Sequence, residues 1–356
     1  LDRLLLDRDR LKDMAQGVMA IVELDDPVGM ESDNRILANG LIVSKRCVPL
    51  GVIGSIYESR PNVTIDIASL CLKSGNACIL RGGSEALESN SALCALIQKA
   101  LQHSGIPKEA VQFIDDQDRN IVNQMLTMDD YIDLLIPRGG ASLVKFVAQH
   151  ATMPTVSGGI GVCHIYVDHQ FNIGEVIPIV LNAKTQRPSV CNALDTLLVH
   201  STAAPLLLPE LAKQLTDSNV ELRCDIRALS LLGPNPPTNV KAADLTDWGQ
   251  EFLDLILSIK VVDSMTEAIN HIDQFGSGHS EAILTNDKEA AGRFVDSVDA
   301  AAVFVNASTR FNDGGELGLG AEVAISTNKF GARGPMGLKE LTSYKWIVVG
   351  NGQTRN

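Results

Sequence analysis

The sequence predicts an α/β protein in which two parallel sheets, each covered by helices, form two domains. Residues 47–83 have the order strand, helix, strand, which is typical of a parallel strand pair joined by a right-handed crossover. A second series of alternating apolar strands and amphipathic helices begins after residue 191. Two segments, 32–46 with the hairpin signal Asn39-Gly40 and 342–349, suit strands outside both series. We expect them to form a small separate β sheet, with extension of the main sheets as the alternative.

The composition argues against several classes of protein. The chain has 356 residues, 45% of them hydrophobic and 21% charged, as in ordinary globular proteins. A net charge of −13 disfavours nucleic acids and anionic membranes as partners. The seven cysteines include no Cys-x-x-Cys pair, so we expect neither disulfides nor a metal site, and a cytoplasmic location. The chain starts at Leu1 inside an amphipathic segment, and we expect further N-terminal helices to precede it.

The first domain is expected to begin with a buried strand at 48–56. Pro61 suits the first turn of a helix, and the apolar stretch 65–72 carries that helix toward Gly75, a typical C-terminal stop. Residues 77–80 then form a second buried strand.

Two strand–helix junctions in this domain share an Arg-Gly-Gly stretch. Arg81-Gly82-Gly83 follows the strand at 77–80, and Arg138-Gly139-Gly140 follows an apolar strand at 133–136. Glycine lets the backbone approach a phosphate, and helix N-termini attract anions, so both junctions are candidates for nucleotide binding. A tight turn that requires glycine is the alternative, because the usual Gly-x-Gly-x-x-Gly motif is absent.

A third glycine pair, Gly158-Gly159, precedes a strand at 162–167 that contains Cys163 and His164. Neighbouring residues on a strand point to opposite faces of the sheet. We therefore expect no catalytic dyad between these two side chains, and place Cys163 in the core.

Cys191 is the candidate nucleophile. It follows two cations, Lys184 and Arg187, and Pro188, which restricts the backbone before it. Positive charge favours the reactive thiolate and could also hold an anionic leaving group, so the pattern indicates covalent catalysis on an anionic substrate. The alternative is a buried structural cysteine after an ordinary loop.

The region after Cys191 predicts a second α/β domain. Its expected strands and helices lie at 196–199, 205–215, 258–262, 281–284, 290–298 and 302–305. The expected border between the domains is the loop that holds Cys191, which would place the thiol in a crevice suited to a ligand.

Motifs along most of the chain are similar to those of the aldehyde dehydrogenase superfamily. They occupy 48–54, 57–63, 136–140, 158–164, 182–192, 306–311 and 333–337. The resemblance implies two Rossmann-like α/β domains plus a small β oligomerisation flap. The implied parts are a nucleotide-binding domain of 1–24, 47–185 and about 320–339, a catalytic domain of 186–319, and an oligomerisation segment of 25–46 and 340–356.

The resemblance also implies a reaction, the NADPH-dependent reduction of L-glutamyl 5-phosphate to L-glutamate 5-semialdehyde in proline biosynthesis. Cys191 would be the nucleophile, and Asn62 would help to form the oxyanion hole. Arg81 suits a 2′-phosphate, which favours NADPH over NADH. The implied cofactor contacts are Arg81, Gly82, Gly83, Arg138, Gly139, Gly140, Gly158, Gly159 and Glu251, and the implied substrate contacts are Lys184, Arg187, Asn192, His279 and Arg310.

Several of these roles have alternatives. Arg310 would bind either the phosphate or the α-carboxylate, and Asn192 either the α-amino end or only its own loop. His279 would be a substrate contact or proton donor, or else a structural loop histidine. Ser157 stands where aldehyde-oxidising relatives place a glutamate that activates water, which favours reduction over oxidation.

Three other functions stay open at this point. The chain could reduce another acyl phosphate or acyl thioester, act as a cysteine hydrolase that pairs Cys191 with His200 or His164, or be a module without activity. For the reductase we expect a homo-oligomer, with a glutamate 5-kinase as a further partner.

Overall fold

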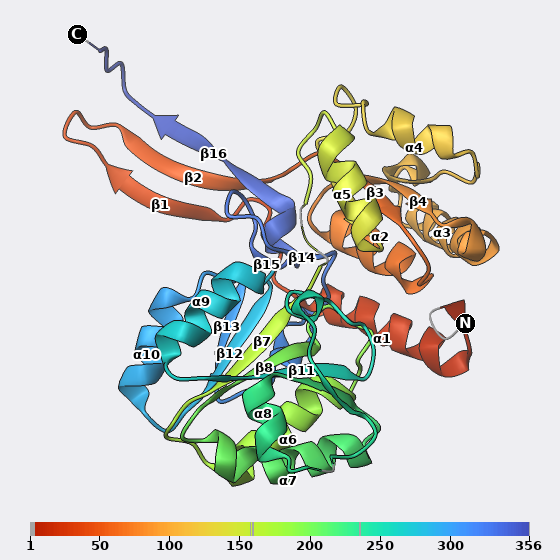
Figure 1. Ribbon diagram of the computed structural model, residues 1–356. Coiled ribbons are helices and arrows are strands. Elements are labelled where there is room, and N and C mark those ends of the chain that lie inside the picture. Colours follow the sequence, from red (N-terminus) through yellow and green to blue (C-terminus); the bar gives the residue numbers. More distant parts are fainter. Residues whose placement is uncertain (1–3, 157, 159, 235, 356) are drawn as a thin grey trace. The chain divides into compact units, whose positions relative to one another are not determined.

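The computed structural model describes residues 4–156, 158, 160–234 and 236–355, and the chain divides into two compact units (Figure 1). The first comprises 1–157, 313–325 and 335–356, and the second comprises 158–312 and 326–334. The division after residue 157 differs from the border expected at Cys191. The reason is that β7 (Cys163–Val167) pairs with β8 (Leu194–His200) and β12 (Ser280–Leu284), and so belongs to the second sheet.

A parallel four-stranded sheet, in the order β5-β4-β3-β6, lies in the first unit. Both predicted junctions are confirmed, because β4 and β6 each end within an Arg-Gly-Gly stretch that leads to a helix. The elements that the chain forms here are α1 (Arg8–Glu23), β3 (Val52–Tyr57), α2 (Asn62–Lys73), β4 (Ala77–Gly82), α3 (Leu87–His103), β5 (Val111–Phe113), α4 (Arg119–Met125), β6 (Leu134–Arg138) and α5 (Ala141–His150).

The single strand predicted at 48–56 is in fact two strands, since β2 (Ile42–Pro49) ends before β3 begins. Gly51 separates them with a φ of 131°, and a Cβ there would overlap the carboxylate of Asp133. Only glycine fits such a turn without strain. The helix expected after Pro61 is confirmed as α2, and Gly75, with a φ of 75°, follows its end.

A separate antiparallel sheet in the first unit has the order β1-β2-β16 (Figure 1). It consists of β1 (Glu31–Ile36), β2 and β16 (Thr342–Val349), and β1 and β2 form the hairpin that the Asn39-Gly40 pair predicts. Its outermost side chains include Tyr344 and Trp346, both more than 45% exposed (54% and 47%). The sheet exists as predicted, and its oligomerisation role stays a prediction.

The second unit contains a parallel seven-stranded sheet in the order β10-β9-β11-β8-β7-β12-β13. Helices α6, α7 and α8 pack on one face of it, and α9 and α10 on the other (Figure 1). Besides β7, β8 and β12, its elements are α6 (Ile173–Thr185), α7 (Ala204–Asp217), β9 (Glu221–Cys224), α8 (Ile226–Leu231), β10 (Val240–Ala242), β11 (Ile256–Val262), α9 (Met265–Phe275), α10 (Lys288–Ser297) and β13 (Ala302–Val305). The short pair β14 (Ile325–Ser326) and β15 (Gly334–Pro335) lies where the chain changes unit.

Four polar side chains form a row across the middle of this sheet, on the face that α9 covers. Ser258, Thr196, His164 and Glu281 stand at matching register positions on adjacent strands, and all are fully buried. The backbone N–H of His164 donates to Oε2 of Glu281 across 2.9 Å, and its ring Nδ1 lies 3.0 Å from the same oxygen. Cys163 points to the opposite face and is buried, so the sequence prediction that these neighbours form no dyad agrees with the geometry.

Candidate active site around Cys191

Cys191 lies in the loop between the end of α6 and the start of β8, and its side chain is partly exposed. The loop backbone is held from one side by residues 161–163. A Cβ on Gly161 would overlap the carbonyl oxygen of Cys191, so the two backbones touch at a position that requires glycine. The thiol of Cys163 donates to the same oxygen across 3.1 Å. These contacts fix the direction of the backbone at Cys191.

Asn192 and Arg310 hold the loop from another side. The Nδ2 of Asn192 donates to the carbonyl oxygen of Asn312 across 3.0 Å, and its Oδ1 accepts from the guanidinium of Arg310. The Nε of Arg310 donates to Oε1 of Gln186 across 2.7 Å. Asn192 is 97% buried, with 3% of its surface exposed. Of its two predicted roles, these contacts support shaping of the loop.

Lys184 differs from its predicted position, because its side chain is fully buried and does not face an open anion site. The Nζ donates to the carbonyl oxygen of Leu194 across 2.9 Å and lies 3.7 Å from Oδ1 of Asp195. Burial lowers the pKa of Lys184, and the charge of Asp195 opposes that shift. Burial likewise raises the pKa of Asp195 to about 7. Arg187, by contrast, is exposed.

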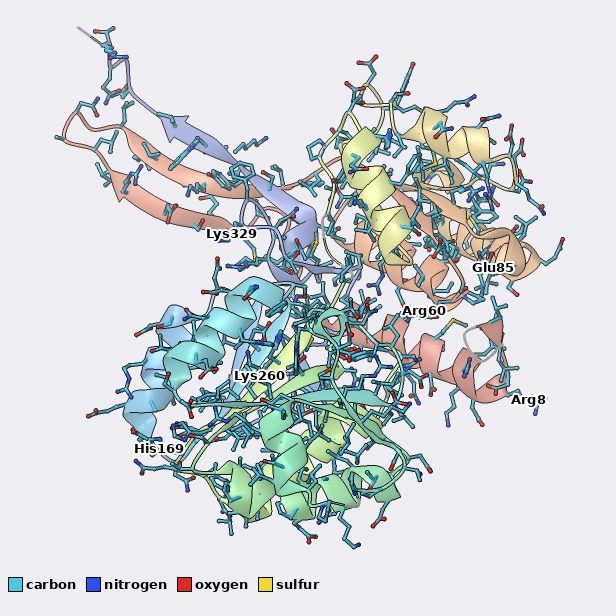
Figure 2. All side chains as sticks on the ribbon, in the orientation of Figure 1. Arg8, Arg60, Glu85, His169, Lys260 and Lys329 are labelled. Atoms are coloured by element: carbon cyan, nitrogen blue, oxygen red, sulfur yellow. The ribbon has the colours of Figure 1, made fainter. Side chains whose placement is uncertain are left out.

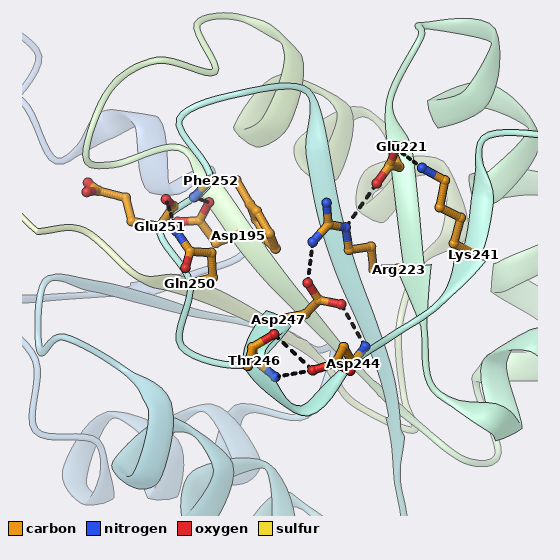
Figure 3. Close-up of polar contacts among 10 residues, drawn as sticks. All are labelled: Asp195, Glu221, Arg223, Lys241, Asp244, Thr246, Asp247, Gln250, Glu251 and Phe252. Atoms are coloured by element: carbon orange, nitrogen blue, oxygen red, sulfur yellow. Dashed lines mark hydrogen bonds and ion pairs between the residues drawn. The ribbon is translucent and has the colours of Figure 1, made fainter.

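Glu251 lies beside the Cys191 segment, on the stretch between β10 and β11. Its Oε1 accepts from the backbone N–H of Gly161 across 2.9 Å, which is the residue packed against Cys191. Burial raises the pKa of Glu251. Figure 3 shows Glu251 next to Phe252, whose N–H donates to Oδ1 of Asp195 across 3.2 Å. Glu251 follows Cys191 by about sixty residues in the sequence, and the fold brings its carboxylate next to the Cys191 loop.

His279 is fully buried near this loop. Its Nδ1 lies 2.8 Å from the hydroxyl of Ser280 and 3.9 Å from the sulfur of Cys163. Its Nε2 has no hydrogen-bond partner among the described residues. Burial lowers the pKa of His279 to about 4, so the ring is neutral at pH 7. A buried, neutral ring agrees with the prediction that His279 is a structural loop histidine. Its hydrogen-bond neighbour is the Ser280 hydroxyl and not a backbone group.

The first unit holds the other predicted cofactor residues. The Nε of Arg81 is buried and has no hydrogen-bond partner among the described residues, whereas its Nη2 donates to the carbonyl oxygen of Gln117 across 3.5 Å. Gly82 packs so closely on Asn90 that a Cβ would overlap the amide. Asn62 is the first residue of α2, and its Nδ2 donates to Oδ2 of Asp66 across 2.9 Å. Burial raises the pKa of Asp66 to about 6.

Two glutamates at the Arg-Gly-Gly junctions were not predicted as site residues. The carboxylate of Glu58 accepts from the N–H of Gly140 across 2.9 Å, and a Cβ on Gly139 would lie 2.5 Å from it. Glu85, labelled in Figure 2, accepts from the N–H of Ser59 across 2.6 Å. The motif at 57–63 contains Glu58 and could have indicated it, whereas Glu85 lies outside that motif.

The turn after β3 is strained. Ser59 and Arg60 (Arg60 is labelled in Figure 2) have φ values of 47° and 63°, in the left-handed region that non-glycine residues rarely adopt. Such residues persist only where the surrounding structure stabilises them. This feature is invisible to sequence patterns.

Two predicted positions, Ser157 and Gly159, lie outside the described residues, and of that glycine pair only Gly158 is described. The described residues contain no group of three or more His, Cys, Asp or Glu side chains placed to hold a metal ion. Every helix among them is too short or too polar to span a bilayer.

Comparison with known proteins gives a consistent family. The model of the aldehyde dehydrogenase family matches residues 19–228. A gamma-glutamyl phosphate reductase of Dehalococcoides mccartyi strain BAV1 is 56% identical over 355 residues, covering 100% of this chain and 84% of the relative. One from Escherichia coli O127:H6 is 54% identical over 351 residues, covering 99% and 84%.

Solved structures agree. The crystal structure of gamma-glutamyl phosphate reductase from Thermotoga maritima superposes with a TM-score of 0.96 at 46% identity, covering 100% of this chain and 84% of that one. An acetylating aldehyde dehydrogenase from Geobacillus thermoglucosidasius gives a TM-score of 0.73 at 19% identity, covering 96% and 83%. The second likeness concerns the fold alone.

Proposed function

Because the chain belongs to the aldehyde dehydrogenase family and, within it, to the gamma-glutamyl phosphate reductases, we propose that Cys191 carries the glutamyl group as a thioester. The reaction is the reduction of L-glutamyl 5-phosphate to L-glutamate 5-semialdehyde and phosphate, in proline biosynthesis. The observation that carries the proposal is the Cys191 loop. A partly exposed thiol stands on a backbone held by Gly161, Cys163 and Asn192.

The first half of the reaction is attack by the Cys191 thiolate on the acyl carbon. The carbon–sulfur bond forms, and the bond to phosphate oxygen breaks. Arg187 and Arg310 are the cations assigned to the departing phosphate, because Arg187 is exposed and the guanidinium of Arg310 is bonded into the same loop. The backbone N–H of Cys191 and the Asn62 amide are assigned to the oxyanion. Asn62 has two amide hydrogens, and the bond to Asp66 uses one of them.

The second half is reduction of the thioester, for which bound NADPH supplies the hydride. The resulting hemithioacetal collapses, releases the semialdehyde and returns the thiolate of Cys191. The buried, neutral His279 is not assigned a proton in these steps, and its contacts support a packing role behind Cys163.

A nicotinamide dinucleotide is supported by two features of the residues present, of which the first favours NADPH. The buried Nε of Arg81 has no partner among the described residues, and a 2′-phosphate would satisfy it. The Glu251 carboxylate next to Gly161 is suited to accept hydrogen bonds from the nicotinamide ribose. The backbone around Arg138-Gly139-Gly140 and Gly158-Gly159 is assigned to the rest of the dinucleotide.

The test of the proposal runs the reaction in reverse, with L-glutamate 5-semialdehyde, phosphate and NADP⁺, and follows absorbance at 340 nm. Wild type should form NADPH only when phosphate is present, and Cys191→Ala should be inactive while binding nucleotide normally. Activity that needs no phosphate would contradict an acyl-phosphate reductase. Activity retained in Cys191→Ala would contradict the thioester.

The cysteine hydrolase alternative needs His164 or His200 to pair with Cys191, but both histidines have other partners. The ring of His164 bonds to Glu281, and the Nδ1 of His200 lies 2.9 Å from the hydroxyl of Thr202. A reductase of another acyl phosphate or thioester is separated by substrate profiling in the same assay.

We further propose a homo-oligomer that pairs through the β1-β2-β16 sheet, whose exposed Tyr344 and Trp346 suit such an interface. Size-exclusion chromatography of Trp346→Glu against wild type tests this, with a smaller species as the expected result.

A glutamate 5-kinase is a chemically reasonable partner, since an acyl phosphate is unstable in water. All seven cysteines are free, which supports a reducing compartment and the proposed cytoplasmic location.

A further inference from the structure

We propose that the buried Lys184–Asp195 pair is a positioning device that closes the base of the Cys191 loop and fixes the segment carrying Glu251. The proposal rests on the proposed function, because it assigns these residues to the nucleophile and cofactor groups named there. It gives Lys184 a role in place of the substrate contact that its buried side chain does not fit.

The first step is the position of the pair at the two ends of the loop. Lys184 belongs to the last turn of α6, and Leu194 and Asp195 begin β8, so residues 186–193 lie between them. The Nζ of Lys184 donates to the carbonyl oxygen of Leu194 across 2.9 Å and lies 3.7 Å from Oδ1 of Asp195. Both side chains are essentially inaccessible, at 0% and 1% exposure. A single ammonium group therefore joins the two ends of the loop.

The second step links the same carboxylate to the segment that carries Glu251. Oδ1 of Asp195 accepts from the backbone N–H of Phe252 across 3.2 Å. Two cations lie near the Phe252 ring, with Nζ of Lys184 5.9 Å and Cζ of Arg223 5.1 Å from its centroid. Figure 3 shows Asp195, Phe252 and Glu251 together.

The third step returns to the nucleophile. Glu251 precedes Phe252, and its carboxylate accepts from the N–H of Gly161, which packs on the backbone of Cys191. The contacts thus run from Lys184 through Asp195 and Phe252 to Glu251, and from there to Cys191. A shift of Asp195 would move both groups of the proposed reaction.

The other end of the Glu251 segment is held by Arg223, which also contacts the Phe252 ring. The guanidinium of Arg223 bonds to the carboxylate of Asp247, whose second oxygen accepts from the N–H of Asp244 across 2.7 Å (Figure 3). Asp195 supplies the acceptor for the backbone N–H of Phe252, the residue next to Glu251.

The last step concerns the energy of the pair. Oδ2 of Asp195 is buried and has no hydrogen-bond partner among the described residues. Taking two charges out of water is costly, and an apolar pair of similar size is often as stable or more stable. An incompletely bonded buried pair is therefore poorly explained by stability, and a geometric task explains it better.

The experiment separates position from stability with two double variants. Lys184→Met/Asp195→Leu removes both charges and all the hydrogen bonds of the pair. Lys184→Met/Asp195→Asn keeps an oxygen for the Phe252 N–H and removes the donor to Leu194. The matched control is Lys213→Met/Asp217→Leu, an exposed pair on α7 with a 2.9 Å contact.

The main readout is backbone hydrogen exchange without nucleotide or substrate. In Lys184→Met/Asp195→Leu, exchange should accelerate by about fivefold or more in both 186–193 and 250–252, with other segments unchanged. The KM for NADP⁺ should rise by about tenfold, and kcat should fall. In Lys184→Met/Asp195→Asn, only 186–193 should exchange faster, and kcat should fall at an unchanged KM.

Two results would overturn the proposal. One is wild-type exchange and kinetics in Lys184→Met/Asp195→Leu. The other is uniform acceleration across the second unit in both variants, which would indicate a merely structural pair. If the leucine variant does not fold, the asparagine variant decides alone, and unchanged exchange in 186–193 then rejects the idea. If wild type shows no phosphate-dependent activity, the proposed function is rejected. The hydrogen-exchange experiment would still test the role of the Lys184–Asp195 pair.

Discussion

The thiol of Cys163 donates a hydrogen bond to the carbonyl oxygen of Cys191 across 3.1 Å. Two cysteines therefore have opposite tasks in this site. Burial raises the pKa of the Cys163 thiol, so it stays protonated and serves as a donor. Cys191 is partly exposed, as a nucleophile of the proposed reaction needs to be.

This contact predicts the effect of Cys163→Ala. Loss of the donor and of a small buried group should lower the free energy of unfolding by about 1–2 kcal/mol and reduce kcat several-fold. The control is Cys224→Ala, which removes a cysteine with 1% exposure from the same sheet. Both variants should lose similar stability in urea unfolding. Equal kcat values for the two would show that the Cys163 contact has no role in catalysis.

We expect a single methyl group added at Gly161 to have a larger effect than Cys163→Ala. A Cβ at this position would overlap the backbone of Cys191, which no side-chain rotation can relieve. Gly161→Ala should therefore lower kcat by about 100-fold or more, and destabilise the protein by more than about 2 kcal/mol. Gly292→Ala is the matched control, because nothing lies within 4 Å of a Cβ there and the residue is in α10. Normal activity in Gly161→Ala would contradict the described backbone packing.

Arg81 predicts the nucleotide preference. Arg81→Ala should raise the KM for NADPH by about tenfold and change that for NADH little, because only NADPH has the 2′-phosphate. Fluorescence titration of both nucleotides gives a readout that does not depend on catalysis. Lys108→Ala, a change of an exposed cation, is the control. An equal loss for both nucleotides would place the role of Arg81 elsewhere.

His279 predicts a dependence of stability on pH. The pKa of His279 falls from an ordinary 6.5 to about 4 in the folded state. Between these two pH values the unfolded chain binds a proton at His279 and the folded chain does not. Stability is thus fully present above pH 6.5 and is lost as pH falls toward 4, by about 3 kcal/mol in total.

His279→Gln should remove that loss, and its unfolding free energy should vary less than that of wild type between pH 6.5 and 4. Urea unfolding across this range provides the measurement. His103→Gln, an exposed change in α3, should leave the wild-type slope. Equal slopes for His279→Gln and wild type would show that His279 titrates normally when folded.

Much of the fold follows from local patterns. The period of apolar residues locates β11, β12 and β13, Asn39-Gly40 locates the hairpin of β1 and β2, and Arg-Gly-Gly marks the ends of β4 and β6. These features depend on residues near one another in sequence, whose backbone preferences are local. The sequence did not predict that Gly51 divides the strand expected at 48–56. The need for glycine there comes from the carboxylate of Asp133, which is distant in sequence and would overlap a Cβ at position 51.

The sequence by itself determined the family and the α/β class, and it made Cys191 the candidate nucleophile, since these depend on residue order and on neighbours such as Arg187. Only the tertiary structure decided what Lys184, Asn192 and Glu251 touch. Lys184 looks like an anion-binding cation in sequence, yet its charge is turned inward toward Asp195. The physical reason is that the partner of a long polar side chain is set by which strands and loops pack around it, and residue type alone carries no information on that packing.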